Sequence, residues 1–216
     1  MLTWERCNEL AEQNGAQGKW SDAESMWIAA LSHLESDDPN DDRFIVTYCR
    51  LADACWSQRK FAESENYYKR CVSMSESHNG PMSMQTAAYL ASLAGAYYNQ
   101  HKYAEAEPLC MRFLEICEGC LGATHDQVGL AVAGLATIYH ARQKFDKAEE
   151  MYQRAIGIRT RAQGGTHPEV IALITKYANL LSLSHREDEA QHLRECAKKF
   201  QTGEWVPQAP DLSEPG

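Results

Sequence analysis

A six-residue motif recurs along the chain at almost constant spacing. It begins with a basic and an aromatic residue and ends with a small residue and Glu, and four copies start at Lys19, Lys60, Lys102 and Lys144. A weaker fifth copy starts at Arg186, so the steps between copies are 41, 42, 42 and 42 residues. A fixed period of this size is typical of stacked repeats, in which each repeat buries its apolar face against its neighbours.

Each copy lies between two helical patterns. An apolar-Ala pair precedes every copy, with another apolar or thiol side chain three residues earlier, which is the stripe of an amphipathic helix. These pairs start at Leu10, Leu51, Leu93, Leu135 and Tyr177. The second pattern includes the small residue of the motif, which in the first four copies is followed four residues later by Trp27, Tyr68, Cys110 or Tyr152. Small residues allow two helices to approach closely, so we predict that the two patterns form a helical hairpin.

Five such hairpins make an all-α fold, and strand signals are absent. Turn residues such as Asn79-Gly80-Pro81 separate the hairpins. The predicted repeats span residues 2–36, 43–78, 84–120, 126–162 and 168–200, so residues 1–200 form the array. The Pro-rich segment 201–216 is expected to be an irregular or disordered tail.

Composition and charge argue against nucleic-acid partners and against a membrane or secreted location. The formal net charge of -9 and the pI near 5.4 argue against nucleic-acid binding, which needs a basic face. No run of eighteen apolar residues and no secretory signal occur, so we expect no membrane insertion and a cytoplasmic location. The eight cysteines lie mostly in helical patterns, which favours reduced thiols over disulfides.

The stretch from Tyr97 to Ile116, followed by Leu121-Gly122 and later by Thr166-His167-Pro168-Glu169-Val170, resembles the roughly 42-residue repeat of kinesin light chains. The resemblance implies a right-handed α-solenoid of tetratricopeptide (TPR) hairpins. It also implies that the first helices line a concave groove that binds a protein or peptide partner.

The repeat register then predicts which first-helix residues face this groove. The candidate binding residues are Cys49, Asp53, Trp56, Ser57, Ala91, Gly95, Tyr98, Asn99, Ala133, Thr137, His140, Thr175 and Asn179. Trp56, Tyr98 and His140 are spaced by 42 residues and should form a row of rings. The rings would contact a peptide, or they are simply common at this position of the repeat. Asn99, Thr137, Thr175 and Asn179 would be available to the backbone of the peptide.

The sequence bears on two further modes of binding, a clamp for an acidic C-terminus and a tail that occupies the groove. Arg50 and Lys176 are the only cations near the groove register, which gives little support to a clamp for an acidic C-terminus. Trp205 in the tail lies in acidic company, so the tail is either a competitor for the groove or, as we favour, a solvated terminus.

The sequence offers little for catalysis. Cys117, Cys120 and His125 have a metal-like spacing, but no second close pair completes a zinc site and Cys117 continues an apolar stripe. His125 and His167 recur with the period and read as loop residues that cap helices, with the neighbouring Thr124 and Thr166 able to accept from the free N–H groups. The repeating glutamates at 24, 65, 107 and 149 and pairs such as Glu150 with Arg154 read as a solvated face. We therefore expect no enzyme activity, no cofactor and no metal.

These observations favour a protein-interaction adaptor that binds a peptide in the groove. The first alternative is end-to-end self-assembly into a homo-oligomer, with Trp4, Leu10 and Trp27 at the contact surface. A thiol or metal-dependent enzyme at Cys117, Cys120 and His125 is the remote alternative.

Overall fold

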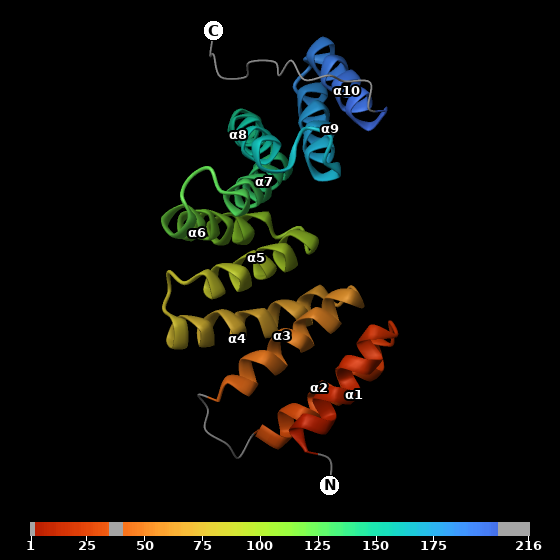
Figure 1. The fold of residues 1–216 in the computed structure, drawn as a ribbon, viewed down its shortest axis with the longest axis vertical. Helices are drawn as coiled ribbons and strands as arrows, with labels where there is room; N and C mark the ends of the chain where they lie inside the picture. Colours follow the sequence, from red (N-terminus) through yellow and green to blue (C-terminus); the bar gives the residue numbers. More distant parts are fainter. Residues whose placement is uncertain (1–2, 35–40, 203–216) are drawn as a thin grey trace. The chain divides into compact units, whose positions relative to one another are not determined.

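The computed structural model describes residues 3–34 and 41–202, and within them the chain forms ten α-helices and no β-strand (Figure 1). The helices are α1 (Trp4–Ala16), α2 (Trp20–Leu34), α3 (Asp42–Ser57), α4 (Phe61–Asn79), α5 (Met84–Asn99), α6 (Tyr103–Leu121), α7 (Asp126–Ala141), α8 (Phe145–Gln163), α9 (Pro168–Leu183) and α10 (Glu187–Thr202). The chain consists of two compact units, residues 1–109 and 110–216, whose boundary falls within α6.

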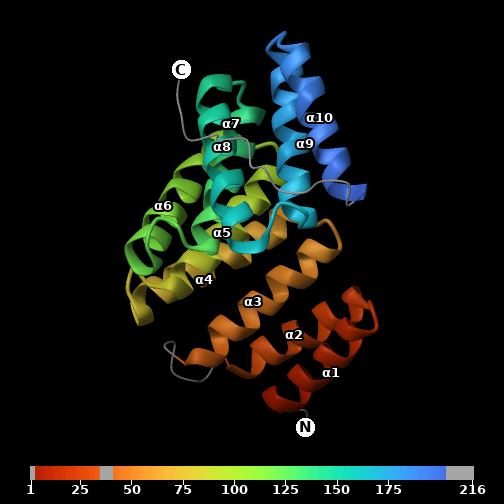
Figure 2. The same ribbon diagram turned by 45° about the horizontal axis from the view of Figure 1, so that its top comes forward.

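Consecutive helices pair into hairpins, and neighbouring hairpins pack on one another inside each unit. In the first unit α1 packs on α2 and α3 on α4, while α2 also contacts α3 and α4 contacts α5. In the second unit α7 packs on α8 and α9 on α10, as Figure 2 shows for the last pair, and α8 contacts α9. The all-α fold of five helical hairpins is confirmed. The predicted loop at residues 37–40 lies outside the described residues, as do residues 203–216 of the predicted tail. The tail was predicted to start at Gln201, but α10 continues through Thr202.

The close approach of the two helices in a hairpin depends on small side chains. Both small residues of each repeat are fully buried or nearly so: Ala11 and Ala23, Ala52 and Ser64, Ala94 and Ala106, Ala136 and Ala148, and Ala178 and Ala190. The one polar member, Ser64, donates its hydroxyl to the carbonyl of Ala52 at 2.9 Å, so its burial leaves no unpaired group. The prediction that these small residues lie between the two helices of each hairpin and allow them to approach closely is confirmed.

Two kinds of turn separate the helices. Within hairpins, one residue adopts a left-handed conformation with φ between 58° and 73°, and the five residues are Gly18, Arg59, His101, Gln143 and His185. Between hairpins, Gly80 and Gly164 have φ of 87° and 85° with ψ of 156° and 152°, a region open essentially to glycine alone. Glycine is therefore a backbone requirement at positions 80 and 164, whereas the turn within a hairpin tolerates other residues at a cost.

Side-chain caps begin the first helix of each hairpin. Thr3, Asp41 and Ser83 accept hydrogen bonds from backbone N–H groups of α1, α3 and α5. In α7 and α9 the cap is a histidine, because Nδ1 of His125 accepts from the N–H of Gln127 and Nδ1 of His167 from that of Glu169. The capping interpretation was right for the histidines. It was wrong for the neighbouring threonines, which precede the N-cap residues and do not supply the cap.

The repeating glutamates join one hairpin to the next. Glu24 on α2 accepts hydrogen bonds at 2.7 Å from both Gln58 and Lys60, which follow α3. Glu65 on α4 accepts in the same way from Gln100 and Lys102, and its side chain is only 8% exposed. The expectation of a solvated face was therefore wrong for these residues, because the next hairpin brings its own donors over them.

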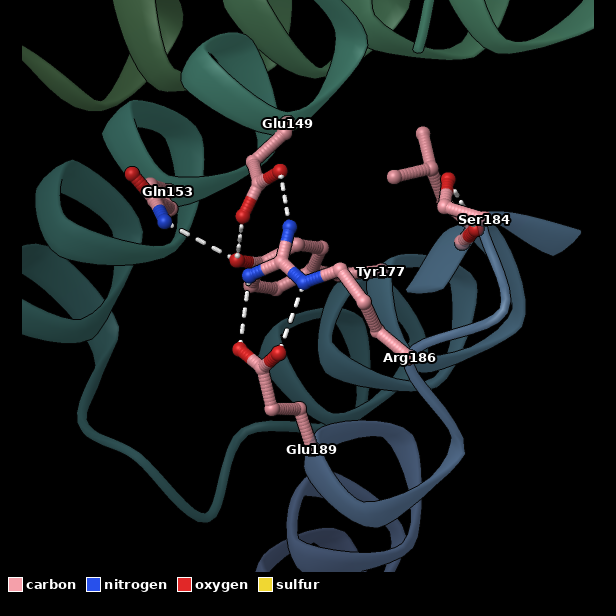
Figure 3. A network of polar contacts seen from close by, with 7 residues as sticks. Glu149, Gln153, Tyr177, Ser184, Arg186 and Glu189 are labelled. Carbon is pink, nitrogen blue, oxygen red and sulfur yellow. Dashed lines mark hydrogen bonds and ion pairs between the residues drawn. The ribbon is translucent and has the colours of Figure 1, made fainter. Parts of the chain in front are cut away.

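The second unit has its own version of this contact (Figure 3). Glu149 on α8 accepts from the hydroxyl of Tyr177 and from Arg186, each at 2.6 Å. Arg186 also donates twice to Glu189, and Gln153 donates to the Tyr177 hydroxyl at 2.9 Å. Burial and the neighbouring Glu149 raise the pKa of Tyr177 to about 12, so the phenol stays protonated and keeps donating. The network ties α8 to the α9–α10 hairpin.

No helix among the described residues combines the length and the apolar character needed to cross a lipid bilayer.

Candidate peptide-binding surface

The thirteen candidate residues lie on the first helices of four hairpins. In the first unit α3 carries Cys49, Asp53, Trp56 and Ser57, and α5 carries Ala91, Gly95, Tyr98 and Asn99. In the second unit α7 carries Ala133, Thr137 and His140, and α9 carries Thr175 and Asn179. All except the buried Ala133 are at least partly exposed. The exposed faces of α3 and α5 in one unit and of α7 and α9 in the other are called the first-helix surface below.

Each ring of the predicted row packs on the beginning of the next helix. The ring centroids of Trp56 and Phe61 lie 5.3 Å apart, as do those of Tyr98 and Tyr103. His140 lies 6.3 Å from Phe145 in the same way. An aromatic residue five positions further along the chain is the signal in the sequence that would have predicted this contact. The rings therefore help to close the hairpins, and only their exposed parts remain for a ligand.

The first and fifth hairpins fill this position differently. Gly15 occupies it in the first hairpin, where an added Cβ would lie 3.3 Å from the ring of Trp20. Ser182 occupies it in the fifth hairpin and accepts a hydrogen bond from Arg194 at 2.6 Å. In the first hairpin the ring of Trp20 therefore lies where a side chain at position 15 would begin, and in the fifth hairpin a hydrogen bond to Arg194 replaces the ring contact.

Trp56 also links two hairpins in the first unit. A Cβ added to Gly95 on α5 would lie 3.0 Å from the indole of Trp56. This is tighter than side chains normally allow, so glycine at position 95 makes room for the indole. Two predicted binding residues, Trp56 and Gly95, are therefore in direct contact and pack on each other.

The polar centre of the first unit is built around Asp53. Its Oδ1 accepts from the hydroxyl of Tyr68 at 2.6 Å, and burial together with this carboxylate raises the pKa of the Tyr68 phenol. The Cys49 thiol lies 4.0 Å from Asp53 Oδ2, and burial followed by the charge of Asp53 raises its pKa to about 11. Cys49 is therefore a neutral thiol at physiological pH, which makes it a poor nucleophile.

The corresponding residues of the second unit carry no carboxylate. His140 Nδ1 lies 3.3 Å from the hydroxyl of Tyr152, whose ring stacks on Tyr177 at 6.2 Å. Burial, and then the positive charge of Lys176, lowers the pKa of His140, so its imidazole is neutral at pH 7.

The four polar residues expected to serve a peptide backbone differ in what they offer. Asn99 donates its amide to the carbonyl of Gly95, and the hydroxyls of Thr137 and Thr175 donate to carbonyls four residues earlier. The hydroxyls of Thr137 and Thr175 can therefore offer only an acceptor, because their single donor is used within their own helices, whereas Asn99 still offers its carbonyl oxygen and one amide hydrogen. Asn179 is exposed and makes no hydrogen bond to any described residue, so its amide offers both donors and acceptor.

The thiol and histidine residues of the remote enzyme alternative have separate roles. Cys117 is fully buried, and burial raises the pKa of its thiol. Cys120 is exposed, and His125 caps α7 through Nδ1. Within residues 3–34 and 41–202, no three His, Cys, Asp or Glu side chains gather closely enough to hold a metal ion.

Sequence and structure comparisons place the chain among known proteins. Models described as tetratricopeptide repeat match residues 85–161, 130–201 and 45–78, which is more than half of the chain. No curated protein matches the sequence.

Several solved structures share the fold. A putative kinesin light chain from Podosopora anserina with nearly identical TPR-like repeats is 19% identical, with a TM-score of 0.80 over 93% of this chain and 95% of that one. BtubC (BKLC) from P. vanneervenii is 20% identical, with a TM-score of 0.79 over 95% and 83% of the two chains. MamA from Desulfovibrio magneticus RS-1 is 12% identical, with a TM-score of 0.71 over 94% and 97%. From the repeat models and the hairpin geometry together, the chain belongs to the tetratricopeptide repeat family.

Proposed function

We propose that this protein binds an extended segment of a partner protein on the first-helix surface of its second unit, which is formed by the exposed faces of α7 and α9. Stacked helical repeats present extended surfaces to other proteins, so a tetratricopeptide fold implies an interaction or scaffold role. The finer claim, that the first helices carry the binding site, is supported by which side chains they leave exposed.

The observation that carries the proposal is that three large apolar side chains on first helices remain exposed at positions that the repeat assigns to the groove. Val46 on α3 and Leu130 on α7 occupy the same position of their repeats and are 41% and 47% exposed. Leu183 on α9 is 58% exposed. The exposed parts of these side chains gain nothing from folding, whereas their burial under a ligand would stabilise a complex by about 1 kcal/mol for each side chain that becomes fully covered.

The charges of the second unit favour a segment that carries an acidic residue. Asp126 and Glu169 are the acidic residues of α7 and α9, and both pair with the buried Arg159. Lys176 is exposed on α9 and has no ion pair with any described residue. Lys176, Asn179 and Leu183 are three or four residues apart in succession and share one helix face, so an acidic and an apolar group of the ligand could bind side by side.

Site-specific photo-crosslinking in native cell extract tests the proposal. A benzoylphenylalanine at position 183 is compared with one at position 162, where Ala162 is exposed near the end of the second helix α8. We expect one partner to crosslink at position 183 alone, and its yield to fall when Lys176→Glu or Asn179→Ala is added. The same partners at both positions, or yields that these substitutions leave unchanged, would contradict the proposal.

Self-assembly through the first hairpin has less support in the structure. Trp27 is 3% exposed and donates its indole N–H to Asn8, so it was wrongly assigned to an end surface. The indole N–H of Trp4 donates to Thr47 at 2.9 Å, and Arg43 lies over the same ring. Leu10 remains half-buried on α1. A homo-oligomer stays a prediction, and light scattering over a range of concentrations tests it.

A further inference from the structure

A pocket lies on the second helices of the second unit, away from the candidate residues discussed above. It has a volume of about 350 Å³ and is formed by α6 and α8, with α7 beneath them. Its lining residues are Met111, Leu114, Glu115, Glu118, Leu135, Tyr139, Lys147, Glu150, Met151 and Arg154. We call it the second-helix pocket.

The floor of the second-helix pocket is apolar and partly open. Met111 on α6 is 51% exposed, and Leu114 and Met151 are half-buried beside it. Leu135 and Tyr139 of α7 are buried and close the base. Flexible, polarisable methionine side chains adapt to differently shaped apolar groups, which is why they recur on surfaces that bind helical segments. The floor therefore suits one or more apolar side chains of a ligand.

The rim carries three carboxylates and two cations, and each cation contacts another group of the pocket. Arg154 forms an ion pair with Glu118, where the sequence pattern had suggested Glu150 as its partner. Lys147 lies over the ring of Tyr139, with its Nζ 5.7 Å from the centroid. Glu150 is thus left without the partner that the sequence pattern gave it.

The three carboxylates that line the pocket outnumber its two cations, so the net charge of the lining is negative. Glu115 on α6 and Glu150 on α8 are exposed, and neither forms an ion pair or hydrogen bond with a described residue. One carboxylate stands on each of the two helices that form the walls. A ligand that contacts the apolar floor therefore lies beside unpaired carboxylates from both helices, and these carboxylates attract cations and repel acidic groups.

We propose that the second-helix pocket docks an amphipathic, basic segment of a partner protein, with leucine-like side chains on the floor and lysine or arginine side chains beside Glu115 and Glu150. Such a segment complements the pocket in both apolar character and charge. This ligand has the opposite charge preference to that of the first-helix surface, so the chain could hold two different segments at once. The two surfaces can be tested separately, because they share no residue.

Methionine-methyl NMR with a synthetic peptide tests this proposal. The probe is a helical fourteen-residue peptide with leucines on one face and flanking lysines, and the matched peptide has glutamates in place of the lysines. We expect saturable shifts of the Met111 and Met151 methyl signals with the lysine peptide and none with the glutamate peptide. Met82, which is 48% exposed in the first unit, reports non-specific apolar contact and should not shift.

Charge reversal completes the experiment. The variant Glu115→Lys/Glu150→Lys should bind the lysine peptide about tenfold or more weakly, because two attractive contacts become repulsive. The control Glu105→Lys changes the charge on α6 outside the pocket and should leave the affinity within about twofold. Circular dichroism melting curves verify that all variants fold.

Three results would overturn the proposal. Equal shifts at Met82 would show non-specific binding, and unchanged affinity in the double variant would show that the carboxylates do not select the ligand. Shifts of Met111 and Met151 that depend on protein concentration without peptide would identify a second copy of the chain as the occupant. Lys176→Glu serves as a further control: it weakens crosslinking at the first-helix surface if that proposal holds, and it should leave peptide binding here unchanged.

Discussion

Replacing Glu65 by Gln should weaken the first unit, because the carboxylate is shared by two hairpins. Its Oε2 accepts from Gln100 and Lys102 at 2.8 Å, and its Oε1 accepts from Lys69 at 2.6 Å. Burial by itself would raise the pKa of Glu65, but hydrogen bonds from Lys102, Lys69 and Gln100 outweigh it and lower the pKa from 4.5 to about 2. A difference of this size corresponds to roughly 3 kcal/mol in favour of the ionised form.

The measured loss should be somewhat smaller, because Lys69 and Lys102 are 48% and 41% exposed and water screens their charges. We expect Glu65→Gln to lower the free energy of unfolding by about 2 kcal/mol. Urea unfolding followed by tryptophan fluorescence measures this, since four of the five tryptophans belong to the first unit. Glu63→Gln, an exposed neighbour on the same helix, is the matched control and should change little.

The same contact predicts a dependence on pH. The folded state holds the Glu65 proton less tightly than the unfolded chain does, so the contribution to stability is fully present above about pH 4.5 and is lost as the pH falls toward 2. Glu65→Gln should remove this part of the acid sensitivity. Equal stability of the Glu65→Gln and Glu63→Gln variants, or an unchanged acid response in Glu65→Gln, would refute the reasoning.

Other predictions concern the turns, the caps and the packing of helices. A Cβ at position 129 would lie 2.6 Å from Cγ of the buried Arg159, so Gly129→Ala should lower the free energy of unfolding by about 1 to 2 kcal/mol. Gly157→Ala on α8 is the matched control: the added Cβ meets open space, so the substitution should raise the free energy of unfolding by up to about 1 kcal/mol, and thermal unfolding measures both. Gln143 has φ of 58°, so Gln143→Gly should stabilise the chain by about 0.5 kcal/mol, and a lower melting temperature would argue against strain at this turn. Ser83 caps α5, so Ser83→Ala should cost about 1 kcal/mol in urea unfolding, and no loss would mean that water replaces the cap.

The repeat register predicted on which helices the candidate residues lie, but it could not predict the contacts that they form. The register identifies first-helix positions, and most of the residues that it selected are only partly exposed. It could not show that Trp56 packs on Phe61 and Gly95, or that the hydroxyls of Thr137 and Thr175 bond within their own helices. Spacing along one helix indicates which face a residue occupies, whereas the bonds it forms depend on the side chains around it.

The sequence by itself determined the ten helices, their pairing and the small residues between them, because these follow from local periodicity and from the 42-residue repeat. Only the tertiary structure decided which charges are buried and which remain free. Arg154 pairs with Glu118, 36 residues away, and leaves Glu150 on its own helix unpaired, while Glu65 is covered by Lys102, 37 residues away. The physical reason is that stacking brings residues almost one repeat apart into contact, and such a contact competes with the local partners that a single helix offers.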